Sequence, residues 1–284
     1  METTRFAPSP TGRLHLGHAL AAAFAWRAAA GGRFLLRLED IDRARCRPEY
    51  ERAIEADLAW LGLEWERPVR RQSEHFDDYA AALDRLQAAG LLYPCFCTRR
   101  EILAEIERIG GAPQGPDGPL YPGTCGQLTA AERRSRIADG LAYALRLDMA
   151  RAGARTGPLA WTDLGRGSQA ARPERFGDVV LARKDLPASY HLAVVVDDAL
   201  QGVSLVTRGE DLFEASHLHR LLQALLDLPV PRWHHHGLVV DETGRRLAKR
   251  HDSLAIAALR AQGRNPAEVL AMAAAACAGA APPA

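Results

Sequence analysis

The sequence predicts an α/β protein built on a parallel sheet that an insertion divides. Three observations support this fold class: the first forty residues alternate strand, loop, helix and strand, strand-like apolar runs resume after residue 176, and the chain between them is irregular and rich in Gly, Pro and Arg. Strands that alternate with helices are typical of a parallel sheet. We therefore expect a Rossmann-like domain over 1–94 and 177–240, an insertion over 95–176, and a loop with a short helical end over 241–284.

The first βαβ unit places polar groups at one edge of the predicted sheet. An extended entry at 5–7 leads through a turn-rich loop at 8–12 into an alanine-rich helix over 15–30. A strand over 33–38 follows and runs directly into Glu39. Because ligands of open α/β sheets bind at the carboxyl ends of the strands, we expect a binding site there.

The later elements follow from hydrophobic periodicity and length. Apolar residues at helical spacing predict helices over 49–62, 75–90 and 212–226, and the Ala-rich end after Val269 predicts a final helix. Short apolar runs that end in polar residues predict buried strands. These runs lie at 179–181, 193–196, 204–207 and 238–240.

Composition restricts the class of protein. With 284 residues, 48% of them hydrophobic and 25% charged, the chain has enough material for a core, which excludes disorder as its main state. No long apolar run and no secretory signal is visible, so we expect a cytoplasmic protein without a membrane span. A net charge of +1 excludes nucleic-acid binding by bulk charge, so any such contact needs a local basic patch.

Three of the five cysteines suggest a metal site. Cys95 and Cys97 form a Cys-x-Cys pair, and Cys125 follows in the predicted insertion. An odd number of unevenly spaced cysteines favours metal binding or free thiols over disulfides. A closed structural zinc site needs four ligands. The thiols alone therefore leave both a zinc site and a metal-free cluster open.

His15, Gly17 and His18 lie where the first loop enters the first helix. Two histidines three residues apart share one helix face, and the glycine between them leaves the backbone accessible. Free N–H groups and the positive end of the helix dipole favour phosphate at such a helix start. The alternative is that both histidines are surface or capping residues.

Five ordered motifs resemble one known family, the glutamyl-tRNA synthetases of the class I aminoacyl-tRNA synthetases. The resemblance covers nearly the whole chain. The motifs are RFAPSPTG at 5–12 followed by HLGH at 15–18, RLEDID at 37–42, ASYHLAVVVDD at 188–198, RGED at 208–211 and GRRLAKR at 244–250.

The resemblance implies activation of L-glutamate by ATP with Mg²⁺. It assigns His15, His18 and Lys249 to catalysis, with Gly17 and Arg246 also contacting ATP. Catalysis of this kind is mostly alignment and neutralisation of phosphate charge. Lys249 falls on the second lysine of the family's KMSKS loop, whereas Arg246 replaces the first lysine and Ala248 replaces the serine.

Glutamate recognition needs a cationic fork for the side-chain carboxylate and an acceptor for the ammonium. Arg5 and Arg208 can supply bidentate pairing, and Glu39 can accept from the amino group. Resemblance assigns the same positions, together with Ala7, Ser9 and Tyr190, to the amino-acid pocket. Ordinary surface ion pairs are the alternative for these charges.

Two polar groups of residues are not given a definite role. The acidic pair 197–198 stays unassigned, since polar residues often end a strand. The histidine tract 234–236 is interpreted as structural or adjacent to the nucleotide, because consecutive strand residues point to opposite faces and cannot converge on one metal.

Short members of the family imply two further features. They use a Cys-x-Cys, Tyr-x-x-x-Cys set, which makes Tyr121 the fourth zinc ligand. Because only a short segment follows Arg250, we expect no anticodon-binding domain. The short members transfer glutamate to queuosine in the anticodon loop of tRNA(Asp), so the resemblance implies this tRNA as partner.

Two other functions remain open at this stage. One is charging of a tRNA 3′ end, and the other is a non-catalytic paralogue that binds an amino acid, a nucleotide or tRNA. Arginines of the insertion are candidates for phosphate contacts or ordinary solvated charges. They are Arg99, Arg100, Arg133, Arg134 and Arg136.

Overall fold

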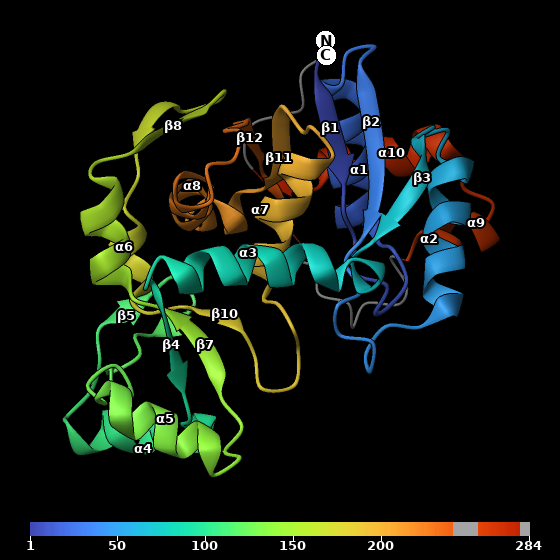
Figure 1. Ribbon diagram of the computed structural model, residues 1–284. Helices are drawn as coiled ribbons and strands as arrows, with labels where there is room; N and C mark the ends of the chain where they lie inside the picture. Colours follow the sequence, from blue (N-terminus) through green and yellow to red (C-terminus); the bar gives the residue numbers. More distant parts are fainter. Residues whose placement is uncertain (241–254, 279–284) are drawn as a thin grey trace.

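The computed structural model describes residues 1–240 and 255–278 (Figure 1). Three parallel strands form the first half of its sheet in the order β1-β2-β3. They are β1 (Thr3–Phe6), β2 (Arg33–Leu38) and β3 (Glu66–Arg71). The α/β class with a parallel sheet, predicted from the sequence, is confirmed.

The second half of the sheet comes from the later part of the chain. Here β11 (Leu205–Gly209) pairs in parallel with β12 (Arg232–His236). The two halves meet at β1 and β11, where the Ser204 amide donates to the Thr3 carbonyl at 3.0 Å. Strand β1 thus lies between β2 and β11, and such a reversal of strand order is where α/β sheets bind ligands.

Two strands from the segment 95–176 extend this second half. Strand β8 (Ala160–Asp163) pairs in parallel with β12, and β9 (Gly167–Ala170) pairs antiparallel with β8. The last part of the predicted insertion therefore contributes to the same sheet as β11 and β12.

Helix α1 (Leu16–Ala28) lies against β1 and β11 and packs on α10 (Pro266–Ala275). Its small alanine side chains allow a close approach to the sheet, and the Thr4 hydroxyl donates to the Ala25 carbonyl at 2.8 Å. The same hydrophobic cluster includes residues of α2 (Pro48–Trp60) and α9 (Ile256–Ala261).

A second core forms around α7 (Tyr190–Leu200) and α8 (Ala215–Leu225). It also contains residues of α3 (Phe76–Ala88) and α6 (Met149–Thr156). The predicted strand over 193–196 is wrong, because these residues belong to α7. All residues from 192 to 198 are buried, so this helix shows no polar stripe that would reveal its period.

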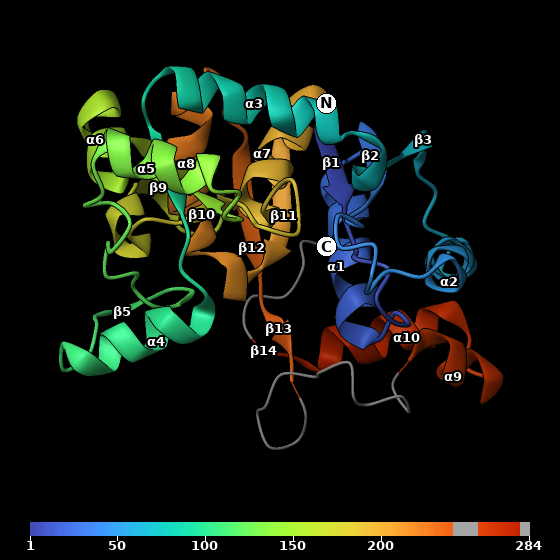
Figure 2. The same ribbon diagram turned by 60° about the horizontal axis from the view of Figure 1, so that its bottom comes forward.

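The remaining part of the insertion projects to one side of the sheet (Figure 2). An antiparallel sheet in the order β10-β7-β4 connects it to the second core. Its strands are β4 (Leu92–Cys95), β7 (Ala144–Leu147) and β10 (Val180–Ala182). The same segment contains α4 (Arg99–Arg108), α5 (Ala130–Ala138) and the hairpin of β5 (Gln114–Gly115) and β6 (Gly118–Pro119).

Short elements complete the described chain. Strand β13 (Leu238–Val239) pairs with β14 (Cys277–Ala278). Single 3₁₀ turns occur at Gln72–Glu74, Pro173–Phe176 and Glu210–Leu212. No helix within 1–240 and 255–278 has the length and apolar character needed to cross a bilayer.

Candidate active site

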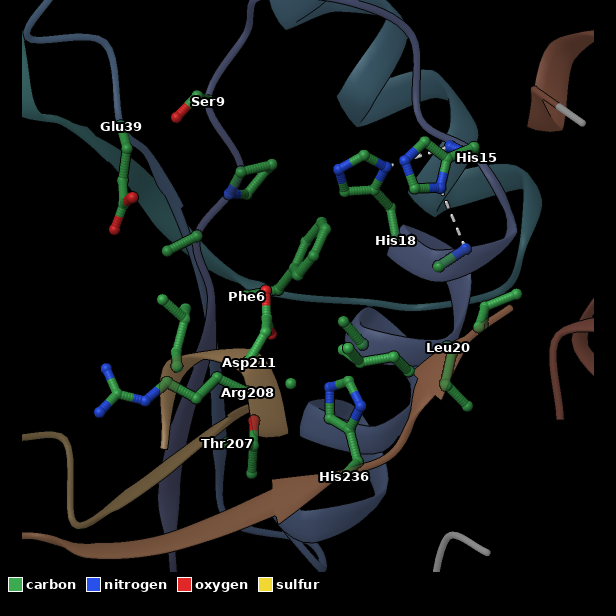
Figure 3. Close-up of a pocket in the computed structure, with 18 of the residues that line it drawn as sticks. Phe6, Ser9, His15, His18, Leu20, Glu39, Thr207, Arg208, Asp211 and His236 are labelled. Carbon is green, nitrogen blue, oxygen red and sulfur yellow. Dashed lines mark hydrogen bonds between the residues drawn. The ribbon is translucent and has the colours of Figure 1, made fainter. Parts of the chain in front are cut away.

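A cavity of about 800 Å³ opens where β1 and β11 meet (Figure 3). Its walls come from the carboxyl ends of these strands, the loop before α1, the end of β2, the start of α7 and the end of β12. Residues predicted from the sequence make up much of its lining. They are Arg5, Ala7, Ser9, His15, Gly17, His18, Glu39, Tyr190 and Arg208.

The structure therefore brings all predicted glutamate residues and three predicted ATP residues to one cavity. Glu39 and Arg208 lie on one side, and His15 and His18 lie on the other. Arg246 and Lys249, the remaining predicted ATP residues, lie outside the residues that the structure describes.

The two histidines form the beginning of α1. His15 is the N-cap, and its Nδ1 accepts from the Gly17 amide at 3.1 Å, while the His15 amide donates to Nδ1 of His18 at 3.2 Å. A Cβ atom at Gly17 would lie 3.0 Å from Cε1 of His15, so the glycine makes room for this cap. The positive end of the helix dipole thus faces the cavity with two imidazoles beside it.

Arg5 lines the cavity, and its charge is paired with a carboxylate of the protein. Its Nε and Nη2 donate to the two carboxylate oxygens of Asp198 at 3.0 and 3.4 Å, and its Nη1 donates to the Thr207 carbonyl at 2.9 Å. The sequence alone predicted a fork for a substrate carboxylate, whereas the fork is directed at a buried carboxylate of the protein.

The acidic pair that the sequence left unassigned supplies this carboxylate and its neighbour. Asp198 also accepts from Nη2 of Arg37 at 2.6 Å. Asp197 accepts from Arg70 at 2.7 Å and from the hydroxyl of Tyr79 at 3.0 Å. Ion pairs of these two aspartates therefore connect the first three strands to α7, and the hydrogen bond from Tyr79 adds α3.

Arg208 is buried at 6% exposure, and its partners are neutral. Its Nη2 donates to Ser216 Oγ at 2.6 Å, its Nη1 lies 3.2 Å from Nδ1 of His219, and its Nε donates to Nε2 of His235 at 3.3 Å. Within the described part of the chain, no carboxylate is hydrogen-bonded to this guanidinium. Burial lowers the pKa of Arg208, which reflects the cost of a desolvated cation.

The histidine tract divides between two faces, as strand geometry predicts. His235 lies between Arg208 and Asp163, with Nδ1 at 2.6 Å from the Asp163 carboxylate, and burial lowers its pKa to about 4. His234 and His236 instead contact the ring of Phe24 on α1. His236 also lines the cavity.

Sequence reasoning missed His219, His191 and Asp163. They lie on three different elements. None of them shares a sequence motif with the side chains to which it is hydrogen-bonded. Two signals were available: His191 lies within the motif at 188–198, and Arg208 is a charged motif residue that requires partners when it is buried.

Glu39 and Tyr190 complete the polar wall. Burial raises the pKa of Glu39 to about 7 although the guanidinium groups of Arg37 and Arg5 act in the opposite direction. Burial likewise raises the pKa of Tyr190, so its hydroxyl stays protonated. The cavity therefore holds a buried cation and a carboxyl group that ionises near neutral pH.

A second cluster lies in the insertion, away from this cavity. The sulfur atoms of Cys95, Cys97 and Cys125 lie within 4.8 Å of one another. The Tyr121 hydroxyl lies 3.4 Å from Cys95 Sγ and 3.6 Å from Cys97 Sγ. The three clustered cysteines could hold a metal ion.

Comparison with known proteins agrees with this geometry. The family described as tRNA synthetases class I (E and Q), catalytic domain, matches residues 2–278. The chain is 53% identical over 274 residues to the Glutamyl-Q tRNA(Asp) synthetase of Rhodobacter capsulatus, which covers 94% of this chain and 97% of that protein. It is 46% identical over 278 residues to the protein of the same name from Symbiobacterium thermophilum, covering 94% and 83%.

Solved structures give the same result. The glutamate-tRNA synthetase of Elizabethkingia anophelis superposes with a TM-score of 0.75 at 28% identity, over 88% of this chain and 52% of that one. The chain thus spans about half the length of that synthetase. Fold, site and family match together show that the chain belongs to the class I tRNA synthetases for glutamate and glutamine, as a catalytic domain.

Proposed function

We propose that this protein activates L-glutamate with ATP and Mg²⁺ and transfers the glutamate to queuosine in the anticodon loop of tRNA(Asp). The similarity to the Glutamyl-Q tRNA(Asp) synthetase of Rhodobacter capsulatus, nearly end to end for both chains, carries this proposal. The cavity supports its first half, because its polar groups complement the side-chain carboxylate and the ammonium of glutamate and a phosphate group. We also propose a cytoplasmic location, since ATP and tRNA are the proposed substrates.

In this proposal the glutamate side chain meets Arg208, and its ammonium meets Glu39. A carboxylate at Arg208 gives the buried guanidinium an anionic partner, and a charge-assisted hydrogen bond of this kind contributes about 1.5–3 kcal/mol. Tyr190, Ala7 and Ser9 line the same cavity. Arg5 adds positive potential while Asp198 fixes its position.

The α-carboxylate oxygen then attacks the α-phosphorus of ATP, and the bond to the pyrophosphate oxygen breaks. The N-terminus of α1 with His15, Gly17 and His18 faces the phosphates and stabilises their negative charge. From the sequence we propose that Lys249 and Arg246 act on the same phosphates.

The acceptor is the part of the proposal that needs a direct experiment. The protein is incubated with labelled glutamate, ATP, Mg²⁺ and queuosine-containing tRNA(Asp). Nuclease digestion of the tRNA then locates the label. We expect label on the anticodon-loop nucleotide that carries queuosine, and none on tRNA(Asp) without queuosine.

Label on the 3′-terminal adenosine would instead support end charging. Similarity to the Glutamate--tRNA ligase of Aquifex aeolicus, 39% identical and covered over 54% of its length, makes this the second candidate. Absence of glutamate-dependent pyrophosphate exchange would contradict both.

We further propose that the insertion over 95–176 holds one structural zinc ion through Cys95, Cys97, Tyr121 and Cys125. Tetrahedral zinc places sulfur ligands about 3.8 Å apart and a sulfur and an oxygen ligand about 3.5 Å apart. The separations of 3.4 Å between Cys97 and Cys125 and of 3.4 and 3.6 Å from Tyr121 fit this geometry. When bound, zinc would cross-link β4 to the loop before α5.

Metal analysis after dialysis tests the zinc site. We expect one zinc per chain in the unaltered protein and none in Cys125→Ser, with loosened α4 and α5 but an intact α/β core. Cys277→Ser is the matched control, since Cys277 lies on β14 outside the cluster. A zinc-free protein of unchanged stability would refute the site.

A further inference from the structure

A chain of hydrogen bonds connects Arg208 to the surface of the insertion. Nη1 of Arg208 lies 3.2 Å from Nδ1 of His219, and Nε2 of His219 lies 3.1 Å from Nδ1 of His191. Nε2 of His191 lies 3.1 Å from the carboxylate of Asp117. Four residues, from β11, α8, α7 and the turn between β5 and β6, thus form one continuous path.

Every proton in this path has a determined position. A guanidinium can only donate, so Nδ1 of His219 accepts and its Nε2 carries the hydrogen. That hydrogen points at Nδ1 of His191, which must therefore accept, so Nε2 of His191 carries a hydrogen and donates to Asp117. The path runs in one direction, from the cation to the carboxylate. Burial lowers the pKa of His219 well below its ordinary range, which keeps it neutral as this direction requires.

The carboxylate end is fixed by a tightly seated hairpin. Asp117 lies in the turn between β5 and β6, where Gln114 pairs with Pro119. A Cβ atom at Gly115 would lie 2.7 Å from the Arg175 carbonyl, so the hairpin backbone lies directly against the Pro173–Phe176 turn. Although Asp117 is 62% exposed, the backbone that carries it is held in place.

We propose that His219 and His191 are positioning residues for Arg208, and that Asp117 makes the glutamate site depend on the β5–β6 hairpin of the insertion. This inference rests on the proposed role of Arg208 in binding the glutamate side chain. His219 orients the guanidinium without neutralising it, so the charge remains available for the substrate. Asp117 accepts from His191 at the far end of the path and so holds the two imidazoles in place through a single surface contact.

Pyrophosphate exchange with separate KM values for glutamate and ATP tests the proposal. We expect His219→Leu to raise the KM for glutamate by about tenfold, with kcat and the KM for ATP changing much less. His219→Gln should recover most of the loss, because its amide can accept from Arg208 and donate to His191. Asp117→Ala should raise the KM for glutamate by about threefold.

Asp185→Ala is the matched control. Asp185 is 65% exposed like Asp117, but its partner is Arg183 on the outer surface. This variant should leave both KM values unchanged. Equal losses in His219→Leu and His219→Gln, or an unchanged KM in Asp117→Ala, would overturn the proposal.

Nitrogen-15 NMR of the histidine rings gives a readout that does not need activity. We expect both His191 and His219 as the Nε2-protonated tautomer, and a shift of the His191 signals in Asp117→Ala. An Nδ1-protonated His219 would overturn the path. If the unaltered protein fails to activate glutamate, the proposed function is wrong, and the NMR result alone then decides whether the path exists.

Discussion

Arg5 and Arg208 reach the same cavity from adjacent strands, yet the protein treats their charges in opposite ways. Arg5 contacts the carboxylate of Asp198 directly, at 3.0 Å. Arg208 contacts only neutral side chains among the described residues, and the carboxylate of Asp163 lies behind the imidazole of His235. Both arginines are equally buried. The difference shows that the position of the counter-charge, rather than burial, determines which cation is available to a ligand.

The two settings also differ in energetic terms. A directly paired arginine stabilises the folded chain but competes poorly for a second anion. Burying a guanidinium among neutral imidazoles costs desolvation free energy that these partners offset only in part. A substrate carboxylate can offset the rest. We therefore interpret the Asp198 side of the cavity as structural support and the Arg208 side as a binding surface.

The largest expected effect comes from removing the direct counter-charge. Asp198→Asn leaves Arg5 and Arg37 buried without their shared carboxylate, and breaking a buried pair of this kind costs about 3–5 kcal/mol. Urea unfolding should show a fall of this size in the free energy of unfolding.

Asp185→Asn controls for loss of a carboxylate as such. Its ion pair with Arg183 is exposed, so we expect a change of about 0–1 kcal/mol. A similarly small effect in Asp198→Asn would mean that the Arg5 side is not structural support, and the comparison with Arg208 would fail.

Arg208→Met should affect glutamate affinity more than the free energy of unfolding. It removes the buried charge while keeping most of the side-chain volume, so the free energy of unfolding should change little or rise. Glutamate affinity should fall by about 10- to 100-fold, since the charge-assisted contact is lost. Calorimetric titration of glutamate and urea unfolding measure the two quantities.

Arg5→Met provides the matched comparison. It should cost stability, because Asp198 loses one of its two cations. If Arg208→Met destabilised the protein more than Arg5→Met without weakening glutamate binding, the roles of the two arginines would be exchanged.

The sequence predicted much of this site but not the difference between the arginines. Strand ends and motif order identified Arg5, Glu39 and Arg208, because the carboxyl ends of parallel strands meet at one edge. They could not identify the partners, since Asp198 comes from a helix whose residues 192–198 are all buried, and its apolar run looks like a strand. His191 and His219 were missed because their roles depend on contacts between α7, α8 and a distant hairpin, which no local pattern encodes.

The smallest expected effect is the pH dependence of glutamate affinity that Glu39 causes. It extends the comparison from the two arginines to the two acids Asp198 and Glu39. Asp198 is held ionised by Arg5 and Arg37 despite its burial, which by itself would raise its pKa, whereas burial raises the pKa of Glu39 to about 7. In the proposed site, the ammonium of glutamate binds the ionised form of Glu39. Affinity should therefore be nearly constant above pH 8 and fall by about tenfold at pH 6, where most Glu39 is protonated.

Calorimetric titration of glutamate without ATP at pH 6, 7 and 8 measures this dependence, and two buffers of different ionisation enthalpy count the protons released. Binding at pH 7 should release about half a proton, because the ammonium shifts Glu39 toward its charged form. Glu39→Gln is the control: it should bind more weakly at every pH, with a flat profile and no proton release. The substrate ammonium stays charged from pH 6 to 8. Because His15, His18 and His236 also line the cavity and imidazoles as a class change charge in this pH range, the flat profile of Glu39→Gln is the result that assigns the response to Glu39. An affinity that is equal at pH 6 and 8 would show that Glu39 does not accept the ammonium, and the acidic half of the cavity would then be structural on both sides.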